Sequence, residues 1–441
     1  MLIFISTFLA LSGQGLAAGL SSLPEYSPTI ALEPHPLPDP PLEREGEKSK
    51  FRLSGTLETY GAFYPQKQAH SDYTGYIEER LLQRLLLIHS DRLLLYMQGD
   101  LRIDSAGLAQ GLGALPVERS GRQPIADLRE GYLEYSDTWY RLRAGKQIFD
   151  WSVTDTVSPA DALSPRDLTD FIRWERIGTP ALDVRVGGDT FVQFVYLPWF
   201  APSRIPTGDN RWATLLPEGV TYAEQSSPRQ EEGQFAVRGG MTTGGFDFGA
   251  SYFYGYSFSP LIRIVPLSSA TFNAQPYYQR NQIVAVSVAG GVMGYNLRAE
   301  TGYIRQQNQD DFIQYVVGID RDWSGLIRPT DSLYALAQYA NELKIGRDSL
   351  EDTGIDFRRV FNNSLLGKLK YTFTEPREWG IRCDWTANMS NGSGYMEPAL
   401  TWERSPFNIE AGYGWLLGDK ETFWGSYSDN SRVFVKGMCR F

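Results

Sequence analysis

Arginine and lysine recur at alternate positions of several short segments, where apolar residues stand between them. The candidate members of this set are Arg141, Arg143, Arg185, Arg238, Arg298, Lys368 and Arg382, with Asp384 as a carboxylate of the same kind. Successive side chains of a strand point to opposite faces, so these residues would share the polar face of a sheet. Opposite charges on such a face can pair and stabilise the sheet. If the sheet closes around a water-filled lumen, rings of fixed charge on its inner face set ion preference. Both roles are open, and a slight excess of cations predicts a mild preference for anionic solutes.

A second group of charged and aromatic residues lies between Gly145 and Pro180. Ser158–Asp161 and Ser164–Asp167 each spell Ser-Pro-x-Asp, which suits an N-cap, a first helical position and a returning carboxylate, so we expect two short helical turns. The members that could narrow a lumen are Trp151, Asp155, Asp161, Arg166, Asp167, Arg173, Glu175 and Arg176. The sequence leaves open whether this loop folds into the lumen or packs over its rim.

Catalytic and metal-binding chemistry has little material here. The chain holds three His and two Cys. Only His70, which is followed by Ser71 and Asp72, would lie in one of the loops expected on the outer side of a membrane protein. Adjacent residues seldom share catalytic geometry, and the sequence has no Cys/His metal spacing or phosphate-binding glycine loop. We therefore predict no enzyme, no metal and no other cofactor. A net charge of -10 argues against a nucleic-acid partner.

The charged positions need strands to hold them, and alternation of apolar and polar residues predicts about 18 strands. The candidates are 51–63, 76–89, 92–104, 127–135, 139–150, 180–187, 190–198, 234–243, 245–257, 277–289, 292–304, 311–320, 332–341, 363–374, 378–388, 395–403, 407–417 and 431–441. One link, 321–331, is long where a short turn is expected, so a count of about 16 also stays open.

The connections alternate between short turns and long loops. This pattern is typical of a transmembrane antiparallel up-and-down β-barrel with short periplasmic turns and long outer loops. A soluble sandwich is the alternative, but strands of about ten residues favour the membrane. Aromatic residues are 13% of the chain, which suits the aromatic girdles of such a barrel.

The two ends of the chain fit the same architecture. Residues 1–18 read as a signal peptide, 19–50 as a Pro-rich periplasmic lead-in, and 51–441 as the barrel. Val433, Val435 and Phe441 lie on the apolar face of the last strand, which we expect to pair with 51–63 and abolish the sheet edge. That strand also resembles the C-terminal aromatic signal read by the barrel-assembly machinery.

A local pattern carries a family resemblance. Gly145-Lys-Gln147, then Asp150-Trp151, the Ser-Pro-x-Asp pair and Thr179-Pro-Ala-Leu182 resemble Gram-negative outer-membrane barrels of the porin-like and alginate-export-like kind. The match covers about residues 139–185 and the terminal strand. It implies a porin-like or export channel of the bacterial outer membrane. Ser stands where Asn is usual in that group, so no ligand role is carried over.

The sequence therefore favours a channel for passive diffusion of small polar, and among them anionic, solutes. One alternative is a dedicated export or import barrel for a polysaccharide or lipid-like substrate, with periplasmic partners. A second is a structural or adhesive surface barrel that binds through loops 199–232 and 342–362. Outer-membrane lipid and the barrel-assembly machinery are expected partners in each case.

Overall fold

A computed structural model describes most of the chain from Lys50 onward. The described residues are 50–68, 71, 73–118, 122–206, 208–213, 220–222, 233–267, 271–307, 310–345, 357–373 and 378–441. The predicted signal peptide and nearly all of the lead-in lie outside these residues. His70 and Asp72 also lie outside them, so the absence of an enzymatic site stays a prediction.

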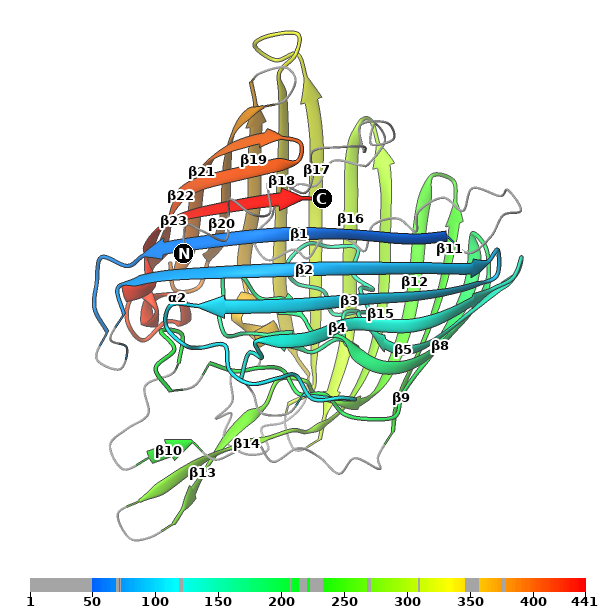
Figure 1. Ribbon diagram of the computed structural model, residues 1–441, viewed down its shortest axis with the longest axis horizontal. Coiled ribbons are helices and arrows are strands. Elements are labelled where there is room, and N and C mark those ends of the chain that lie inside the picture. Colours follow the sequence, from blue (N-terminus) through cyan, green and yellow to red (C-terminus); the bar gives the residue numbers. More distant parts are fainter. Residues whose placement is uncertain are drawn as a thin grey trace.

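Eighteen antiparallel strands form one closed wall (Figure 1). In chain order they are β1 (Lys50–Phe63), β2 (Gly75–Ser90), β3 (Leu93–Asp104), β4 (Ala126–Ser136), β5 (Tyr140–Gln147), β8 (Thr179–Gly187), β9 (Thr190–Leu197), β11 (Gln234–Thr243), β12 (Phe246–Tyr256), β15 (Arg280–Val292), β16 (Tyr295–Gln306), β17 (Phe312–Ser324), β18 (Ser332–Lys344), β19 (Ser364–Thr372), β20 (Trp379–Asn388), β21 (Gly394–Arg404), β22 (Phe407–Leu417) and β23 (Arg432–Arg440). Each pairs with its neighbour in sequence. The predicted fold class and the count of 18 are confirmed.

The wall closes where β1 meets β23. Their register runs from Thr56 opposite Arg440 to Phe63 opposite Val433, so the closing strand pairs as the sequence predicted. Closure leaves no unpaired edge in the wall. The fold is a closed antiparallel up-and-down β-barrel, which confirms the porin-like resemblance at the level of architecture. The alginate-export likeness stays a prediction.

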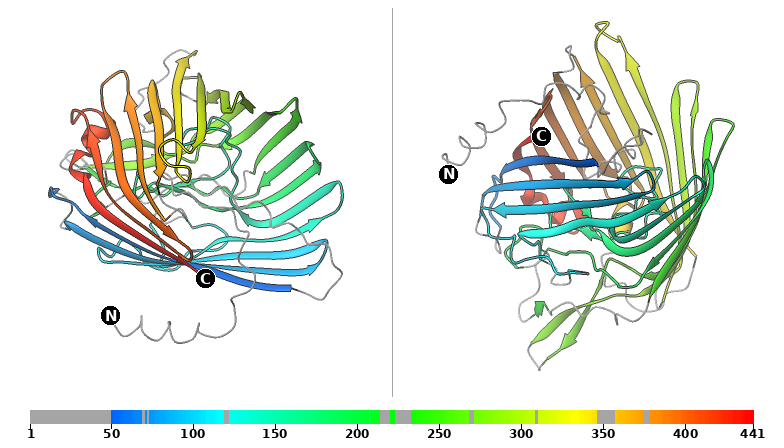
Figure 2. Two further views of the ribbon diagram at one scale, coloured as in Figure 1. Left: turned by 90° about the horizontal axis from the view of Figure 1, so that it is seen from above. Right: turned by 45° about the vertical axis from the view of Figure 1, so that its right-hand side comes forward.

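Smaller elements lie at the long-loop end. β6 (Arg166–Asp167) and β7 (Glu175–Arg176) pair inside the loop between β5 and β8. β10 (Val220–Tyr222), β14 (Phe272–Tyr277) and β13 (Leu261–Pro266) form a three-stranded sheet that projects from the barrel (Figures 1 and 2). The helical segments are η1 (Phe357–Phe361), α2 (Phe423–Ser426) and η2 (Ser428–Asn430). No helix among the described residues has the length and apolar character needed to cross a membrane.

The strands turn their apolar residues outward. Each of the 18 strands carries at least one large apolar side chain that is exposed on the outer surface, among them Leu53, Leu101, Val286, Val317 and Ile381. On β23, Val433 and Val435 are 45% and 50% exposed, whereas the alternate residues Phe434 and Met438 are 4% and 6% exposed. Phe434 stacks inside the wall on Tyr60, with ring centroids 6.3 Å apart. Both free cysteines, Cys383 and Cys439, sit on the outward parity, as the sequence predicted.

Several predicted boundaries were wrong. The turn expected near Gly290 and Gly291 lies at Met293 and Gly294, so β15 and β16 each begin about three residues later than predicted. Met293 and Gly294 both have positive φ, at 51° and 80°, and only that pair provides the left-handed backbone of a tight turn. Strand β17 extends to Ser324, which shortens the predicted 321–331 link to residues 325–331.

We expect Val435→Arg to destabilise the barrel by about 2–4 kcal/mol, because the outward side chain at the middle of β23 would place a charge in hydrocarbon. Met293→Arg is the matched control, since Met293 lies at a turn and is 92% exposed, and it should leave stability nearly unchanged. Urea unfolding in lipid vesicles measures both. Equal stability of the two variants would contradict the assignment of the outer surface.

Candidate functional site

The loop that joins β5 to β8, residues 148–178, lies inside the barrel. Its side chains contact β2 on one wall and β16 on the far wall. Trp151, Leu163 and Trp174 are buried within the ring of strands, at 4%, 1% and 3% exposure. The view along the barrel shows chain crossing the interior (Figure 2). Of the two placements that the sequence left open, the loop takes the one in the lumen.

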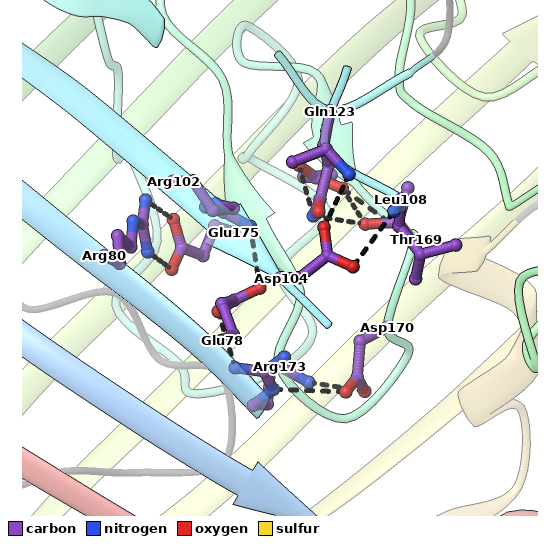
Figure 3. A network of polar contacts seen from close by, with 12 residues as sticks. Glu78, Arg80, Arg102, Asp104, Leu108, Gln123, Thr169, Asp170, Arg173 and Glu175 are labelled. Atoms are coloured by element: carbon purple, nitrogen blue, oxygen red, sulfur yellow. Dashed lines mark hydrogen bonds and ion pairs between the residues drawn. The ribbon is translucent and has the colours of Figure 1, made fainter. Parts of the chain in front are cut away.

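On the β2–β3 wall the loop is held by buried ion pairs (Figure 3). Arg80 of β2 binds Asp100 of β3, with Nε–Oδ1 at 2.9 Å, and Glu175 of the loop, with Nη2–Oε2 at 2.8 Å. Arg129 also donates to Glu175. One guanidinium therefore joins two adjacent strands to β7 of the loop. Such charge-assisted pairs hold both partners in one geometry.

A second pair of contacts lies beside the first. Arg173 binds Glu78 of β2 and Asp170, each at 3.1 Å (Figure 3). Its guanidinium also lies 3.7 Å from the ring centroid of Tyr60. Arg432 of β23 lies 3.8 Å from Asp170. These contacts extend the loop's anchorage from β2 across β1 to the closing strand.

The anchoring carboxylates stay charged at neutral pH. Burial raises the pKa of Glu175, but the guanidinium groups of Arg80 and Arg129 outweigh it and hold that pKa well below its usual range. Burial likewise raises the pKa of Asp170, and Arg432 and Arg173 lower it overall. A carboxylate with a depressed pKa stabilises the docked loop above its ordinary pKa and loses that contribution only as pH falls through the depressed value. The anchorage is therefore complete at neutral pH.

The far wall holds the start of the loop through Glu300 of β16. Its carboxylate accepts hydrogen bonds from the backbone N–H groups of Val153 and Thr154, the latter at 3.0 Å, and from the hydroxyl of Ser158. These donors come from consecutive parts of one turn of the loop. The carboxylate therefore fixes the backbone of that turn against the wall.

Asp155 fixes the same turn to the neighbouring strands. It accepts from Arg298 of β16 at 3.1 Å and from the side-chain amide of Gln338 of β18 at 3.4 Å. Arg298 also binds Asp320 of β17 at 2.8 Å. The predicted residues Asp155 and Arg298, far apart in sequence, thus meet in the lumen.

The middle of the loop is braced by its own charges. Asp161 binds both Arg166 and Arg176, and Arg176 reaches Asp150 at 2.9 Å. The Arg166 guanidinium lies 4.0 Å from the ring centroid of Trp174, a cation–π contact. The loop is consequently a compact unit with its own buried ion pairs.

The two predicted helical turns are wrong. Ser158 gives its hydroxyl to Glu300, and Ser164 accepts the N–H of Phe149 at 2.8 Å, so neither serine caps a helix. The second unit instead supplies β6, and its Asp167 binds Arg204 at 3.0 Å. Residues distant in sequence, Glu300 and Arg204, bind the side chains that would otherwise have capped a helix.

The predicted polar face does point inward, and most of its charges are paired. Arg141 lies 3.6 Å from Asp183, and Arg143 binds Glu134. Arg185 lies over the ring of Phe191 at 3.7 Å, with Arg238 at 5.9 Å from the same ring.

On the opposite wall, one guanidinium gathers three carboxylates. Arg382 of β20 binds Asp384, Glu397 at 2.9 Å and Glu410 at 3.2 Å, and Lys368 Nζ lies 4.0 Å from Asp384. These ion pairs connect the four neighbouring strands β19, β20, β21 and β22. These predicted residues brace the wall, which was one of the two roles left open.

Sequence reasoning missed the β2–β3 anchors. Glu78, Arg80 and Arg102 are buried polar residues on the inner face, and Asp100 is partly buried beside them, but Glu79 and the leucine run that follows Arg80 hide the alternation of β2. It also missed Arg211, which is fully buried and donates to the backbone carbonyls of residues 66 and 73 in the β1–β2 loop and of residue 429 in the β22–β23 loop. A lone arginine in a long loop gave no sequence signal. Among the residues that the structure describes, no group of three or more His, Cys, Asp and Glu could hold a metal ion.

No protein-family model and no curated protein matches the sequence. Among solved structures, the chain is similar to OmpT, an outer membrane protein of Vibrio cholerae, at 12% identity over 90% of this chain and 99% of that chain, with a TM-score of 0.43. It is similar to Salmonella typhi OmpF in complex with daunomycin at 12% identity, 89% and 98% coverage and a TM-score of 0.41. It is also similar to Pseudomonas aeruginosa OccK11 (OpdR) at 8% identity, 88% and 94% coverage and a TM-score of 0.47.

We expect Glu175→Gln to weaken the docking of the loop by about 1–3 kcal/mol, because the charged partners Arg80 and Arg129 lose their carboxylate. Tryptic cleavage after Arg173 and Arg176, followed by mass spectrometry, measures how often the loop opens. Glu421→Gln removes an exposed carboxylate from another loop and should not change the cleavage rate. The assignment fails if both variants are cleaved at the wild-type rate.

Proposed function

We propose that this chain is a channel of the bacterial outer membrane through which small polar solutes diffuse passively. The observation that carries the proposal is the loop 148–178, which is held inside the lumen by polar contacts to both walls. The apolar outer surface supports a membrane setting, and the polar inner face supports a hydrated path. No step in this function needs a chemical reaction.

In this proposal the loop sets the size limit. Its constriction residues Trp151, Asp155, Asp161, Arg166, Asp167, Arg173, Glu175 and Arg176 fill lumen space or brace the residues that do. The cavities that the loop leaves beside β12 and β15 and beside β18 to β21 are about 50 Å³ and about 30 Å³. Such narrow spaces suit small solutes. A polysaccharide would pass only if the loop left the lumen.

Ion preference would come from one section of the inner wall. On the neighbouring strands β5, β8, β9 and β11 the charged residues are the cations Arg141, Arg143, Lys146, Arg185 and Arg238 and the single anion Asp183. Glu134 of β4 pairs with Arg143, and Asp127 pairs with Lys146. Even with these two carboxylates included, cations outnumber anions on this section of the wall by five to three, which supports a preference for anionic solutes.

A dedicated export or import barrel is the second candidate, and the extent of the loop's anchorage favours it over a wide general pore. Periplasmic partners belong to that candidate. For either function we propose that Val433, Val435 and Phe441 are read by the barrel-assembly machinery during insertion. Lipid would then contact the outward side chains of the same strand.

Replacing residues 151–176 by a short Gly-Ser linker should raise single-channel conductance by about twofold or more, because the loop occupies the cross-section of the lumen. A planar bilayer recording measures this. The matched control replaces 261–277, which holds the projecting β13–β14 hairpin, and should leave conductance near the wild-type value. A folded wild-type barrel without any conductance would sink the open-channel proposal. A wild-type pore that only the loop replacement opens would instead favour the dedicated transporter.

Reversal potentials in a salt gradient should show that wild-type protein passes chloride more readily than potassium. In the double variant Arg185→Gln, Arg238→Gln the chloride-to-potassium permeability ratio should fall by about twofold, because two fixed cations leave the inner wall. Arg404→Gln removes a cation from the outward face of β21 and should not alter the ratio. A wild-type permeability ratio in the double variant would show that Arg185 and Arg238 do not set the ion preference.

A further inference from the structure

A cavity lies between the inward loop and the β18–β21 wall. It measures about 30 Å³, which is room for more than a single water. Aromatic side chains from five separate segments line it: Phe171 and Trp174 of the loop, Phe361 of η1, Trp385 of β20, Tyr395 of β21 and Trp424 of α2. Trp424 stacks on Tyr395 with ring centroids 5.9 Å apart. The cavity therefore has flat apolar surfaces fixed by packing.

Three buried polar side chains that line this cavity have an atom without a hydrogen-bond partner. They are the Oε1 atom of Gln338, the hydroxyl of Thr386 and the indole N–H of Trp424, and each side chain is less than a tenth exposed. The side-chain amide N–H of Gln338 is already donated to Asp155, which leaves its oxygen as a fixed acceptor. Buried polar atoms almost always find partners, so three around one cavity indicate a ligand that supplies them.

The available atoms define the chemistry of that ligand. Gln338 accepts, Trp424 donates, and the Thr386 hydroxyl does either. Molecules with several hydroxyl groups meet this mixture, because each hydroxyl both donates and accepts while the carbon chain lies against the aromatic rings.

Charge argues for a neutral ligand. The charged residues that line the cavity are Asp155, Lys368 and Asp384. Asp155 binds Arg298, and Asp384 binds Arg382 and lies 4.0 Å from Lys368. Each charge that lines the cavity is thus already bound to an opposite charge within the protein, whereas a charged ligand would bring a charge that has no such partner.

The size of the space favours a small molecule. A second cavity of about 50 Å³ lies on the β12–β15 side of the loop and shares Thr156, Trp174 and Phe361 in its lining. Asn281 lines that cavity with an unpartnered Oδ1 while only 1% exposed. The two narrow spaces adjoin at Trp174.

We propose that this cavity is a binding subsite for small neutral polyols, formed by Gln338, Thr386 and Trp424 among the aromatic rings. The inference rests on the proposed channel function, for which it names a substrate class. It places the contact on the wall opposite the cationic strands β5 to β11, so uncharged solutes and anions would use different surfaces of one lumen.

Titration calorimetry on the detergent-solubilised full chain, with glycerol, erythritol and xylitol as probes, tests the subsite. Thr386→Val keeps the shape of the side chain and removes the hydroxyl, and it should raise the dissociation constant for xylitol by about threefold to tenfold. Trp424→Phe keeps an aromatic ring without the N–H and should do the same. Thr179→Val is the control, because Thr179 also has a buried unpartnered hydroxyl but does not line the cavity. It should bind xylitol like wild type.

Wild-type affinity in both Thr386→Val and Trp424→Phe would overturn the subsite, as would no binding of any polyol. Tighter binding of gluconate or glucosamine than of xylitol would also overturn it, because the site would then select charge. Bilayer conductance of the same preparation separates this result from the proposed function. A conducting barrel without polyol binding refutes the subsite alone, whereas polyol binding by a barrel that never conducts refutes the channel.

Discussion

The structure depends on one constraint, which is that a wall in hydrocarbon must satisfy every backbone N–H and C=O between its own strands. Pairing β1 with β23 meets that constraint by removing the last free edge. Once the sheet is closed, the period of two sends alternate residues to lipid and to the lumen. Val435 and Phe434 are neighbours in sequence, yet one faces outward and the other lies buried within the barrel.

Closure also creates a problem inside the barrel. Eighteen strands enclose more space than their own side chains fill, and the inner face carries charges that are costly to bury alone. The loop 148–178 resolves both difficulties. It brings Glu175 to Arg80 and Arg173 to Glu78 on one wall, and backbone N–H groups to Glu300 on the other. The charges of the wall thereby become the anchors of the loop.

Much of the barrel could be predicted from the sequence, because strand alternation and turn length are local signals. The inward direction of Arg382 and Arg298 followed from parity alone. The partners of those residues did not, since Arg382 meets Glu410 only after three strands have folded beside one another. The Ser-Pro-x-Asp units show the limit most clearly. Their local signal for a helix was sound, but Glu300 and Arg204, distant in sequence, bound Ser158 and Asp167 instead.

The division of the lumen follows from the same anchoring. Because both ends of the loop are tied to charged groups, its aromatic residues Phe171 and Trp174 face the part of the wall where the charges are already bound to one another. The cationic strands β5 to β11 lie across the barrel from that region. Apolar rings and unpartnered dipoles therefore gather on one side and net positive charge on the other. A single inward loop thus separates two chemical environments that the alternation of the strands alone would have mixed.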